Sequence, residues 1–395
     1  MEKTVGDFFM LFRPLGSKDR SILKQAKEYL DPENIKDLAF LLKQKKINAR
    51  IKYLSISKDL FHQTEECIVF EANTKDSEVN DYVTEANLQI QKKFFKKQYK
   101  AFAKHAPLRI SKLIASHIIG HDVIKRAVAL QLFASDPIHI LLLGDPAIGK
   151  TDILRGAADM HPISTYGLGS GMSGVGLAVT MIGDVVEPGL LPQADQGIAC
   201  IDELNLLKQE NYGALYNAME KGFITYDKKG KHLKLDARIR LLATANPKGD
   251  KFTGKTIKEL QKQIPFDQAL LSRFHLVFLV KRPDTYQFLK ITDKILKQKN
   301  KSITKTDLEF LKSYICYAEQ LKVTLPDIYH QQIVSFVHDL KKKEQHGLLD
   351  ISPRLVVGIK RMAMARARMC LREKVSQEDI NEIKTIIERG LRVDH

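Results

Sequence analysis

The middle of the chain alternates short, mostly apolar blocks with longer segments in which apolar residues recur every three or four positions. Three of the blocks are ILLLG at 140–144, IACID at 198–202 and IRLLATAN at 239–246, and the last two end in a polar residue. Unbroken runs of this kind are typical of strands that are buried on both faces of a parallel sheet. For about residues 106–282 we therefore predict an α/β fold, with helices on both faces of a parallel sheet.

Beyond this core the pattern is helical. From residue 283 to residue 395 the apolar positions repeat only with helical spacing, and the ladder from Val356 to Ala367 is typical of a helix that faces a core. The pattern predicts a C-terminal helical lid over 283–395.

Residues 1–105 combine helical and strand patterns. Two helical patterns lie within 16–44, and residues 49–56 and 67–72 have strand character, as in a hairpin with a long connection. The polar segment 75–81 is expected to be a loop. We predict a small N-terminal α+β domain, whose role the pattern leaves open.

A basic amphipathic helix is predicted over 87–105. Its aromatic residues are Phe94, Phe95, Tyr99 and Phe102, and its lysines are Lys92, Lys93, Lys96, Lys97, Lys100 and Lys104. This mixture can bind nucleic acid through phosphate contacts and base stacking. The alternative, which we favour, is that the aromatic residues pack on the core while the lysines are solvated.

The most informative motif follows the first apolar block. In LLLGDPAIGKT at 141–151, Gly144, Gly149, Lys150 and Thr151 have the spacing G-x-x-x-x-G-K-[ST] of a phosphate-binding loop between a strand and a helix. Its backbone N–H groups and the helix dipole favour a bound anion. Lys150 can reach the β and γ phosphates of ATP, and Thr151 can hold Mg²⁺. The nucleotide-binding residues expected from the motif are Gly144, Asp145, Pro146, Ala147, Ile148, Gly149, Lys150, Thr151 and Asp152.

Polar residues at the ends of other strands add catalytic candidates. Asp202 is expected to bind the metal, and Glu203 to polarise the water that attacks the γ-phosphate. Asn246 can fix the same water, although an Asn before Pro is also a common turn. Arg273, in LLSRFHLVFLV, can supply positive charge to a neighbouring subunit's γ-phosphate or be an ordinary surface arginine.

Composition and charge narrow the class of protein. The 395 residues are 44% hydrophobic and 28% charged, as in a globular protein of two or three domains. No apolar run approaches the roughly 20 residues of a membrane span, and the N-terminal FFMLF is too short for a secretory signal. We therefore expect an intracellular protein, cytoplasmic or nucleoid-associated, with no membrane partner.

The net charge of +16 favours nucleic acid or another polyanion as a partner, although solvated lysine-rich faces alone also give such a value. The four cysteines are scattered and none forms C-x-x-C, so no zinc site is expected.

Taken in order, these segments resemble the AAA+ ATPases and, within them, the minichromosome maintenance (MCM) replicative helicases and their relatives. The resemblance covers about residues 113–392. The segments that carry it are SHIIGHDVIKRAVALQLF, GDPAIGKT, YGLGSGMSGVGL, EPGLLPQADQGIACIDELNLL, ALYNAMEKGFITY, LLATANP, LLSRF and SPRLVVGIKRMAMARARMCLREKVSQEDI.

The resemblance implies roles for further residues. Ile118, Ile119 and His121 would border the adenine, Asn246 would be sensor 1 and Arg273 the arginine finger. Arg354 would be the sensor-2 arginine, which in this family reaches the ATP of an adjacent subunit. Two departures bear on subunit contacts: His275 stands where the family has Asp, and Asn205 where it has an acid.

The hairpin predicted at 224–238 is the main candidate for DNA binding. In the family this hairpin points into the channel of a ring and holds the DNA backbone. Its tip here carries Lys228, Lys229 and Lys231, which can bind phosphates without reading sequence. The alternative is a solubilising turn.

The expected function is that of an MCM-like AAA+ ATPase. It would act as a homo-oligomeric ring, a hexamer by resemblance, that translocates on or unwinds single-stranded or forked DNA in replication, of the host or of a mobile element, with a loader or partner subunit. Only about a hundred residues precede the core, too few for the family's usual N-terminal modules. The alternatives are a protein remodeller, as in the related MoxR and magnesium-chelatase proteins, or an ATP-binding partner subunit of a helicase ring.

Overall fold

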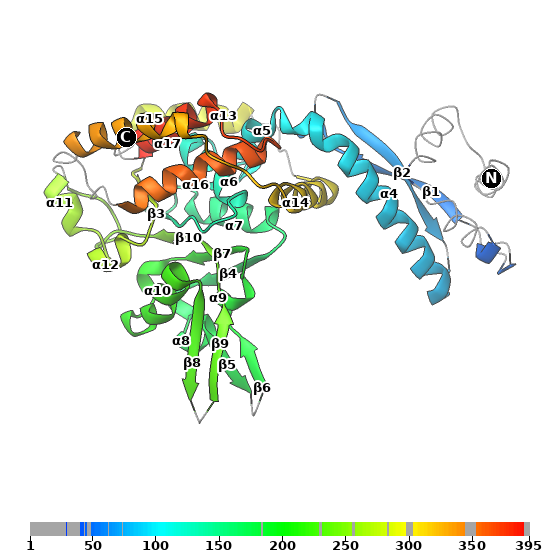
Figure 1. Ribbon diagram of the computed structural model, residues 1–395, viewed down its shortest axis with the longest axis horizontal. Helices are drawn as coiled ribbons and strands as arrows, with labels where there is room; N and C mark the ends of the chain where they lie inside the picture. Colours follow the sequence, from blue (N-terminus) through cyan, green and yellow to red (C-terminus); the bar gives the residue numbers. More distant parts are fainter. Residues whose placement is uncertain are drawn as a thin grey trace. The chain divides into compact units, whose positions relative to one another are not determined.

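A computed structural model of the chain (Figure 1) describes residues 29, 40–42, 44–45, 49–61, 63–72, 74–182, 185–228, 231–254, 257–282, 284–297, 303–343 and 353–390. The chain forms two compact units. The first comprises Met1–Lys104 and Ile303–Tyr314, and the second comprises His105–Ser302 and Ile315–His395. No helix among the described residues is both long enough and apolar enough to cross a membrane.

The first unit contains the predicted hairpin. Strand β1 (Ala49–Ile56) pairs antiparallel with β2 (Glu65–Ala72), with Ala49 opposite Ala72. Helix α4 (Ser77–Ala103) follows. The loop predicted at 75–81 is therefore wrong from Ser77 onward, because the Asp76 carboxylate caps the helix by accepting a hydrogen bond from the Val79 N–H (3.3 Å). Most of the helical patterns within 16–44 lie outside the described residues.

An aromatic cluster forms the core of this unit. Phe310, on the part of helix α14 (Lys305–Glu319) that belongs to it, is fully buried, with its ring centroid 5.3 Å from Phe95 and 5.2 Å from Phe102 in edge-on contacts. The lysines of α4 are exposed, and Phe94, Phe95, Tyr99 and Phe102 are buried. The packing interpretation of α4 is confirmed.

The second unit is built on a five-stranded, fully parallel sheet in the order β11-β3-β10-β7-β4. Its strands are β3 (Ile140–Gly144), β4 (Ser164–Leu168), β7 (Ile198–Asp202), β10 (Arg240–Ala245) and β11 (Leu276–Val280). The predicted α/β core is confirmed. Since all five strands run the same way, their carboxyl ends share one edge of the sheet and their amino ends share the other.

Helices cover both faces of this sheet (Figure 1). On one face, the Cys200 thiol lies 3.7 Å from the Leu154 carbonyl of α7. On the other, Leu141, Ala199 and Leu241 belong to the same apolar cluster as Leu215 of α10. The helices and single turns of this part are α5 (Ala106–Leu113), α6 (Asp122–Leu132), α7 (Lys150–Met160), α8 (Gly174–Leu177), α9 (Leu190–Gln193), α10 (Tyr212–Lys221), α11 (Ile257–Lys262) and α12 (Gln268–Leu271).

The C-terminal part is helical, as predicted. After α13 (Thr285–Lys297) and α14 come α15 (His330–Lys343), α16 (Pro353–Met369) and α17 (Gln377–Gly390). A single parallel bridge joins Thr324 to Lys374.

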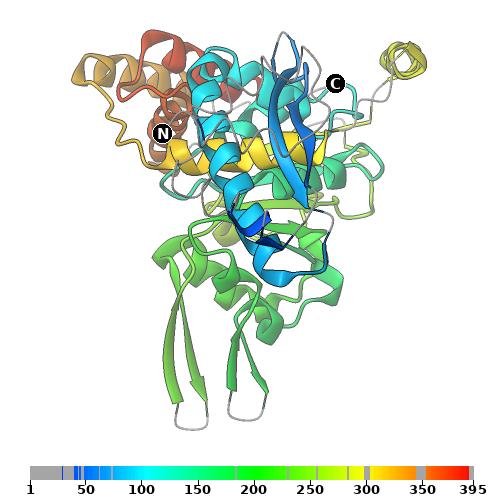
Figure 2. The ribbon, with the colours of Figure 1, turned by 90° about the vertical axis from the view of Figure 1, so that its right-hand side faces the viewer.

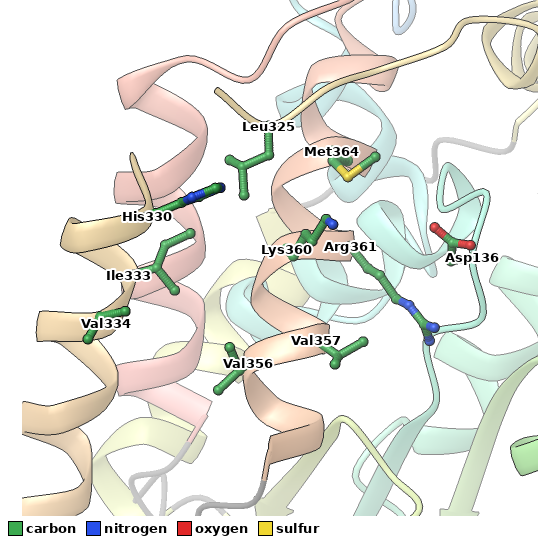
Figure 3. Close-up of a pocket in the computed structure, with 10 residues that line it drawn as sticks. All are labelled: Asp136, Leu325, His330, Ile333, Val334, Val356, Val357, Lys360, Arg361 and Met364. Carbon is green, nitrogen blue, oxygen red and sulfur yellow. The ribbon is translucent and has the colours of Figure 1, made fainter. Parts of the chain in front are cut away.

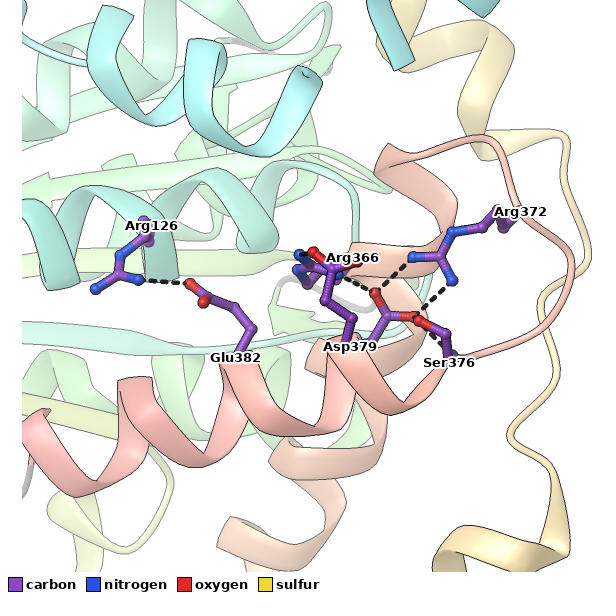
Figure 4. Close-up of polar contacts among 7 residues, drawn as sticks. Arg126, Arg366, Arg372, Ser376, Asp379 and Glu382 are labelled. Carbon is purple, nitrogen blue, oxygen red and sulfur yellow. Dashed lines mark hydrogen bonds and ion pairs between the residues drawn. The ribbon is translucent and has the colours of Figure 1, made fainter. Parts of the chain in front are cut away.

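A buried carboxylate ties the last two helices together (Figure 4). The Asp379 side chain is fully buried in α17 and accepts hydrogen bonds from Arg366 of α16, from Arg372 (2.6 and 2.8 Å) and from Ser376. Burial by itself would raise the pKa of Asp379, but these bonds from Arg372, Ser376 and Arg366 lower it overall.

Two antiparallel hairpins extend from the unit in the same direction and side by side in both views (Figures 1 and 2). One is the predicted hairpin, β8 (Phe223–Lys228) with β9 (Lys231–Asp236). The other, β5 (Val179–Ile182) with β6 (Val185–Pro188), was not predicted. Its signal was available, because two β-prone runs flank the dipeptide Gly-Asp.

Candidate nucleotide-binding and active site

The predicted phosphate-binding loop connects the carboxyl end of β3 to the first residue of α7. Gly149 has φ +82°, and a Cβ there would lie 2.8 Å from the Ile118 side chain. At Gly144 a Cβ would lie 2.2 Å from the Val280 carbonyl oxygen. Both positions therefore require glycine, one for its backbone conformation and one for a close approach between strands.

Lys150 connects the loop with the neighbouring strand. Its Nζ donates hydrogen bonds to the carbonyls of Gly144 (2.8 Å) and Asp145 (2.6 Å) and to Oδ1 of Asn246 (3.1 Å). Burial lowers the pKa of Lys150 to about 8, against the opposite pull of nearby carboxylates. Because β10 lies beside β3, Asn246 directly after β10 comes within reach of the lysine.

Asp202 lies at the carboxyl end of β7 and accepts from three hydroxyl groups. Thr151 Oγ1 donates to its Oδ1 (3.2 Å), Tyr166 to its Oδ2 (2.9 Å), and Thr244 to its Oδ1. Tyr166 and Thr244 were missed in the sequence. Both lie on the strands that flank β7, and Thr244 could have been found as a polar residue near the end of an apolar strand.

This donor set fits a magnesium nucleotide. Thr151 and Asp202 offer hard oxygen ligands within 3.2 Å of each other, as Mg²⁺ prefers. Glu203 follows in a left-handed conformation (φ +53°), and its N–H donates to Thr244 Oγ1 (2.9 Å). A non-glycine residue held in this conformation is typical of functional sites.

Asn205 holds the backbone of Asn246. The Asn246 N–H donates to Oδ1 of Asn205 (2.9 Å), so this departure from the family pattern makes a contact within its own chain. From the sequence, this residue was considered only for its bearing on subunit contacts. The bond joins the turn after β7 to the end of β10.

The residues expected around the adenine lie on the segment before α6. Ile118 contacts Gly149. The backbone of His121 has φ +56°, and its ring forms a hydrogen bond with the Ile148 carbonyl (2.9 Å). Ile119 is half-buried in the same segment. The structure brings Ile118 and His121 against the loop.

The loop carboxylates have local partners. Asp145 accepts from the N–H groups of Phe252 (2.8 Å) and Arg282 (3.0 Å), and Asp152 lies 3.2 Å from the His117 ring. Asp145 therefore ties the loop to the chain that leaves β11.

Arg273 and Arg354 lie elsewhere. Arg273 precedes the first residue of β11 by three positions, so it is at the amino-terminal edge of the sheet, whereas the loop is at the carboxyl-terminal edge. Arg354 donates to the Ser272 carbonyl (3.1 Å) and is therefore beside Arg273. Across the five residues of β11 the two edges are about 17 Å apart. The structure brings these two arginines together but not with Lys150.

Arg273 is held by the helix that leads into the β8–β9 hairpin. Its guanidinium forms an ion pair with Glu220 (2.8 Å) and stacks 4.2 Å over the Tyr216 ring, both on α10. Gly222, with φ +72°, ends α10 and is followed at once by β8. Arg273 therefore contacts the helix from which the chain continues into this hairpin.

His275 belongs to a buried pair. Its N–H donates to the His139 carbonyl, and its Nδ1 accepts from the His139 N–H (3.0 Å). Burial, with the nearby His139 and Arg361, lowers the pKa of His275 to about 2, so the ring is neutral. This departure from the family pattern also makes its contacts within the chain.

In the candidate DNA-binding hairpin, Lys228 pairs with Lys231 across the turn, at the far end of β8 and β9. Lys229 lies outside the described residues.

Comparison with known proteins places the two halves of the chain in one family. The family model described as the MCM P-loop domain matches residues 96–299, and the model described as the MCM AAA-lid domain matches residues 309–391.

Individual proteins with similar sequences support the same family. The chain is 30% identical over 306 residues to the DNA replication licensing factor mcm7 of Xenopus tropicalis, covering 71% of this chain and 42% of that protein. It is 31% identical over 296 residues to the minichromosome maintenance protein MCM of Saccharolobus solfataricus, a match that covers 69% of this chain and 43% of that protein. An uncharacterised MCM-type protein of Methanocaldococcus jannaschii is 32% identical over 352 residues, a match that covers 80% of this chain and 49% of that protein.

The chain spans less than half the length of these relatives. Its own phosphate-binding loop, parallel sheet and helical lid are the parts that match. The chain therefore belongs to the MCM family of AAA+ ATPases.

Proposed function

We propose that this chain is an ATP-dependent DNA translocase or helicase that works as a homo-oligomeric ring, most simply a hexamer, in DNA replication. Residues 106–282 would be the ATPase core, 283–395 the lid, and 1–105 a small N-terminal domain. The observation that carries the proposal is the separation of Arg273 and Arg354 from the nucleotide loop across the length of the sheet.

This separation favours a site that is shared between subunits. A side chain of Arg reaches roughly 7 Å, less than half of the roughly 17 Å between the two edges. The arginines can therefore act on a nucleotide only if it belongs to another copy. A head-to-tail contact of this kind closes into a ring when its rotation allows.

Within one copy, the residues around the loop have complementary roles. Lys150 would bind the β and γ phosphates, and Ile118, Ile119 and His121 would border the adenine. Thr151 and Asp202 would hold Mg²⁺, which neutralises phosphate charge when bound. Glu203 would take the proton of the attacking water, and Asn246 would orient that water.

The neighbouring copy would supply Arg273 and Arg354. Arg273 would interact both with Glu220 of its own α10 and with the γ-phosphate bound by the neighbouring copy. Cleavage of that phosphate would therefore change the strength of the Arg273–Glu220 ion pair. Since α10 continues into β8, that change is transmitted to the hairpin, where Lys228, Lys229 and Lys231 would hold DNA phosphates.

The test is the ATPase rate with and without single-stranded or forked DNA. We expect DNA to stimulate the wild type several-fold, and the Lys228→Ala/Lys229→Ala/Lys231→Ala variant to lose the stimulation while keeping its basal rate. The matched control is Lys92→Ala/Lys93→Ala/Lys96→Ala, which removes the same charge from the exposed face of α4.

An ATPase that ignores DNA in all three proteins would contradict the proposal and favour a protein remodeller or a partner-dependent subunit. Stimulation that the α4 variant also loses would mean that only net charge matters.

A further inference from the structure

Helix α13 carries an unusual amount of exposed apolar surface. Phe288, Leu289, Ile295 and Leu296 are 59%, 61%, 54% and 81% exposed. Their spacing of i, i+1, i+7 and i+8 places them on one face of the helix. In Figure 2 the helix, in yellow at the upper right, stands apart from the other helices of its unit. An apolar helical face of this kind is typical of a docking element.

The same unit contains an apolar groove of about 450 Å³ (Figure 3). Its walls are α15, with Ile333 and Val334, and α16, with Val356, Val357 and Met364. Val334 is 60% exposed, so its side chain is presented at the surface. The groove and α13 thus have matching chemistry on one chain.

The two surfaces lie at opposite edges of the sheet. Helix α13 begins five residues after β11 ends, and Arg282 between them donates its N–H to Asp145 of the phosphate-binding loop. The groove is at the other edge: its wall α16 begins at Pro353, the next residue, Arg354, is bonded to Ser272, and Asp136 at its rim precedes β3.

This placement matches the direction of the shared ATP site. If Arg273 and Arg354 of one copy face the nucleotide loop of the next, then the groove of the first copy faces the α13 of the second. We propose that α13 of each subunit docks its apolar face into the α15–α16 groove of the neighbouring copy. The choice of which edge of one subunit faces which edge of the next rests on the proposed function. The apolar character of both surfaces is independent of it.

Docking would also give the ring a contact that does not depend on nucleotide. Docking would remove from water the apolar side chains of α13 in one subunit and those of α15 and α16 in its neighbour. The helix would thereby hold the loop edge of one subunit against the arginine edge of the next.

Self-association tests this interface through matched charge substitutions. Leu289→Lys on α13 and Val334→Lys on the groove should each weaken assembly at least about tenfold in sedimentation, since each replaces an apolar contact by a positive charge near Lys360 and Arg361 of the groove. The control is Lys294→Asp, on the polar face of α13, which should assemble like the wild type. Equal assembly of all three variants would overturn the proposal.

A crosslinking experiment identifies the occupant without relying on destabilised variants. In a Cys316→Ser/Cys370→Ser background, chains with Leu289→Cys are mixed with tagged chains carrying Val334→Cys and treated with a short bismaleimide. The expected product is a dimer of one chain of each kind. A product formed only within a single chain carrying both cysteines would mean that α13 fills its own groove, and no product would mean that it fills neither; both overturn the proposal.

The ATPase of Arg273→Ala separates the two claims. If the wild type hydrolyses ATP and Arg273→Ala does not, but crosslinking fails, only the α13 contact is wrong. If the wild type crosslinks as expected but never hydrolyses ATP, the contact stands and the proposed function fails.

Discussion

Asn205 determines where the end of β10 lies, and with it the side chain of Asn246. If Asn246 orients the attacking water, Asn205→Ala should lower the ATPase turnover number about tenfold, the effect of losing one hydrogen bond worth about 1.4 kcal/mol. The affinity for ATP should change less than about threefold, because Lys150 and the loop keep their other bonds.

Steady-state kinetics measures both quantities. Asn205→Asp keeps the accepting oxygen and should recover part of the turnover, while Lys208→Ala, an exposed change in the same loop, should have no effect. A loss of ATP affinity with unchanged turnover would show that Asn205 acts on binding instead.

At this scale the sequence revealed the residues that belong to a motif and missed those that support them. Lys150, Thr151 and Asp202 could be predicted because their spacing within one segment carries the chemistry. Thr244 could have been noticed as a polar residue near the end of an apolar strand, but its contact with Asp202 could not be predicted, nor could that of Tyr166. Both contacts depend on the lateral strand order β4-β7-β10, which local spacing does not determine.

At the scale of elements, apolar runs predicted the sheet strands well, and polar segments were the weak point. Ser77, Glu78, Asn80 and Asp81 are polar, yet they are helical, since a cap at Asp76 starts the helix and Val79 is the only apolar residue among its first five. The β5–β6 hairpin was missed for a different reason: its β-prone runs flank a turn dipeptide, but each strand has only four residues, which makes the signal weak.

The α16–α17 pair depends on a single buried carboxylate. Asp379→Asn should lower the free energy of unfolding by about 3 kcal/mol, because it leaves the Arg366 and Arg372 guanidinium groups without their ionised partner. Glu382→Gln, which removes the partly exposed ion pair with Arg126, should cost less than about 1 kcal/mol. Urea denaturation compares the two.

The pH dependence of this difference has a defined sign. Since the pKa of Asp379 is lowered in the folded protein, its contribution is complete above the unfolded value of about 3.9 and is lost as pH falls through the folded value. The gap between wild type and Asp379→Asn should therefore be constant from pH 5 to 7. A gap that already closes at pH 6 would contradict this assignment.

At the scale of the whole molecule, the sheet separates the loop that binds the nucleotide from the arginines that would complete the site. The sequence predicted both sets of residues, but their positions at opposite edges follow from the parallel order of the strands. On the proposed function, one chain holds two half-sites, and an active site needs two chains.

Mixing two inactive variants tests this most directly. Lys150→Ala keeps the arginines and loses the loop lysine, and Arg273→Ala does the reverse. We expect each variant alone to have little ATPase activity, and a mixture to regain a substantial fraction of the wild-type rate, because an Arg273→Ala loop can then face a Lys150→Ala arginine. A mixture no more active than the sum of its parts, with co-assembly shown by pull-down, would contradict a shared site.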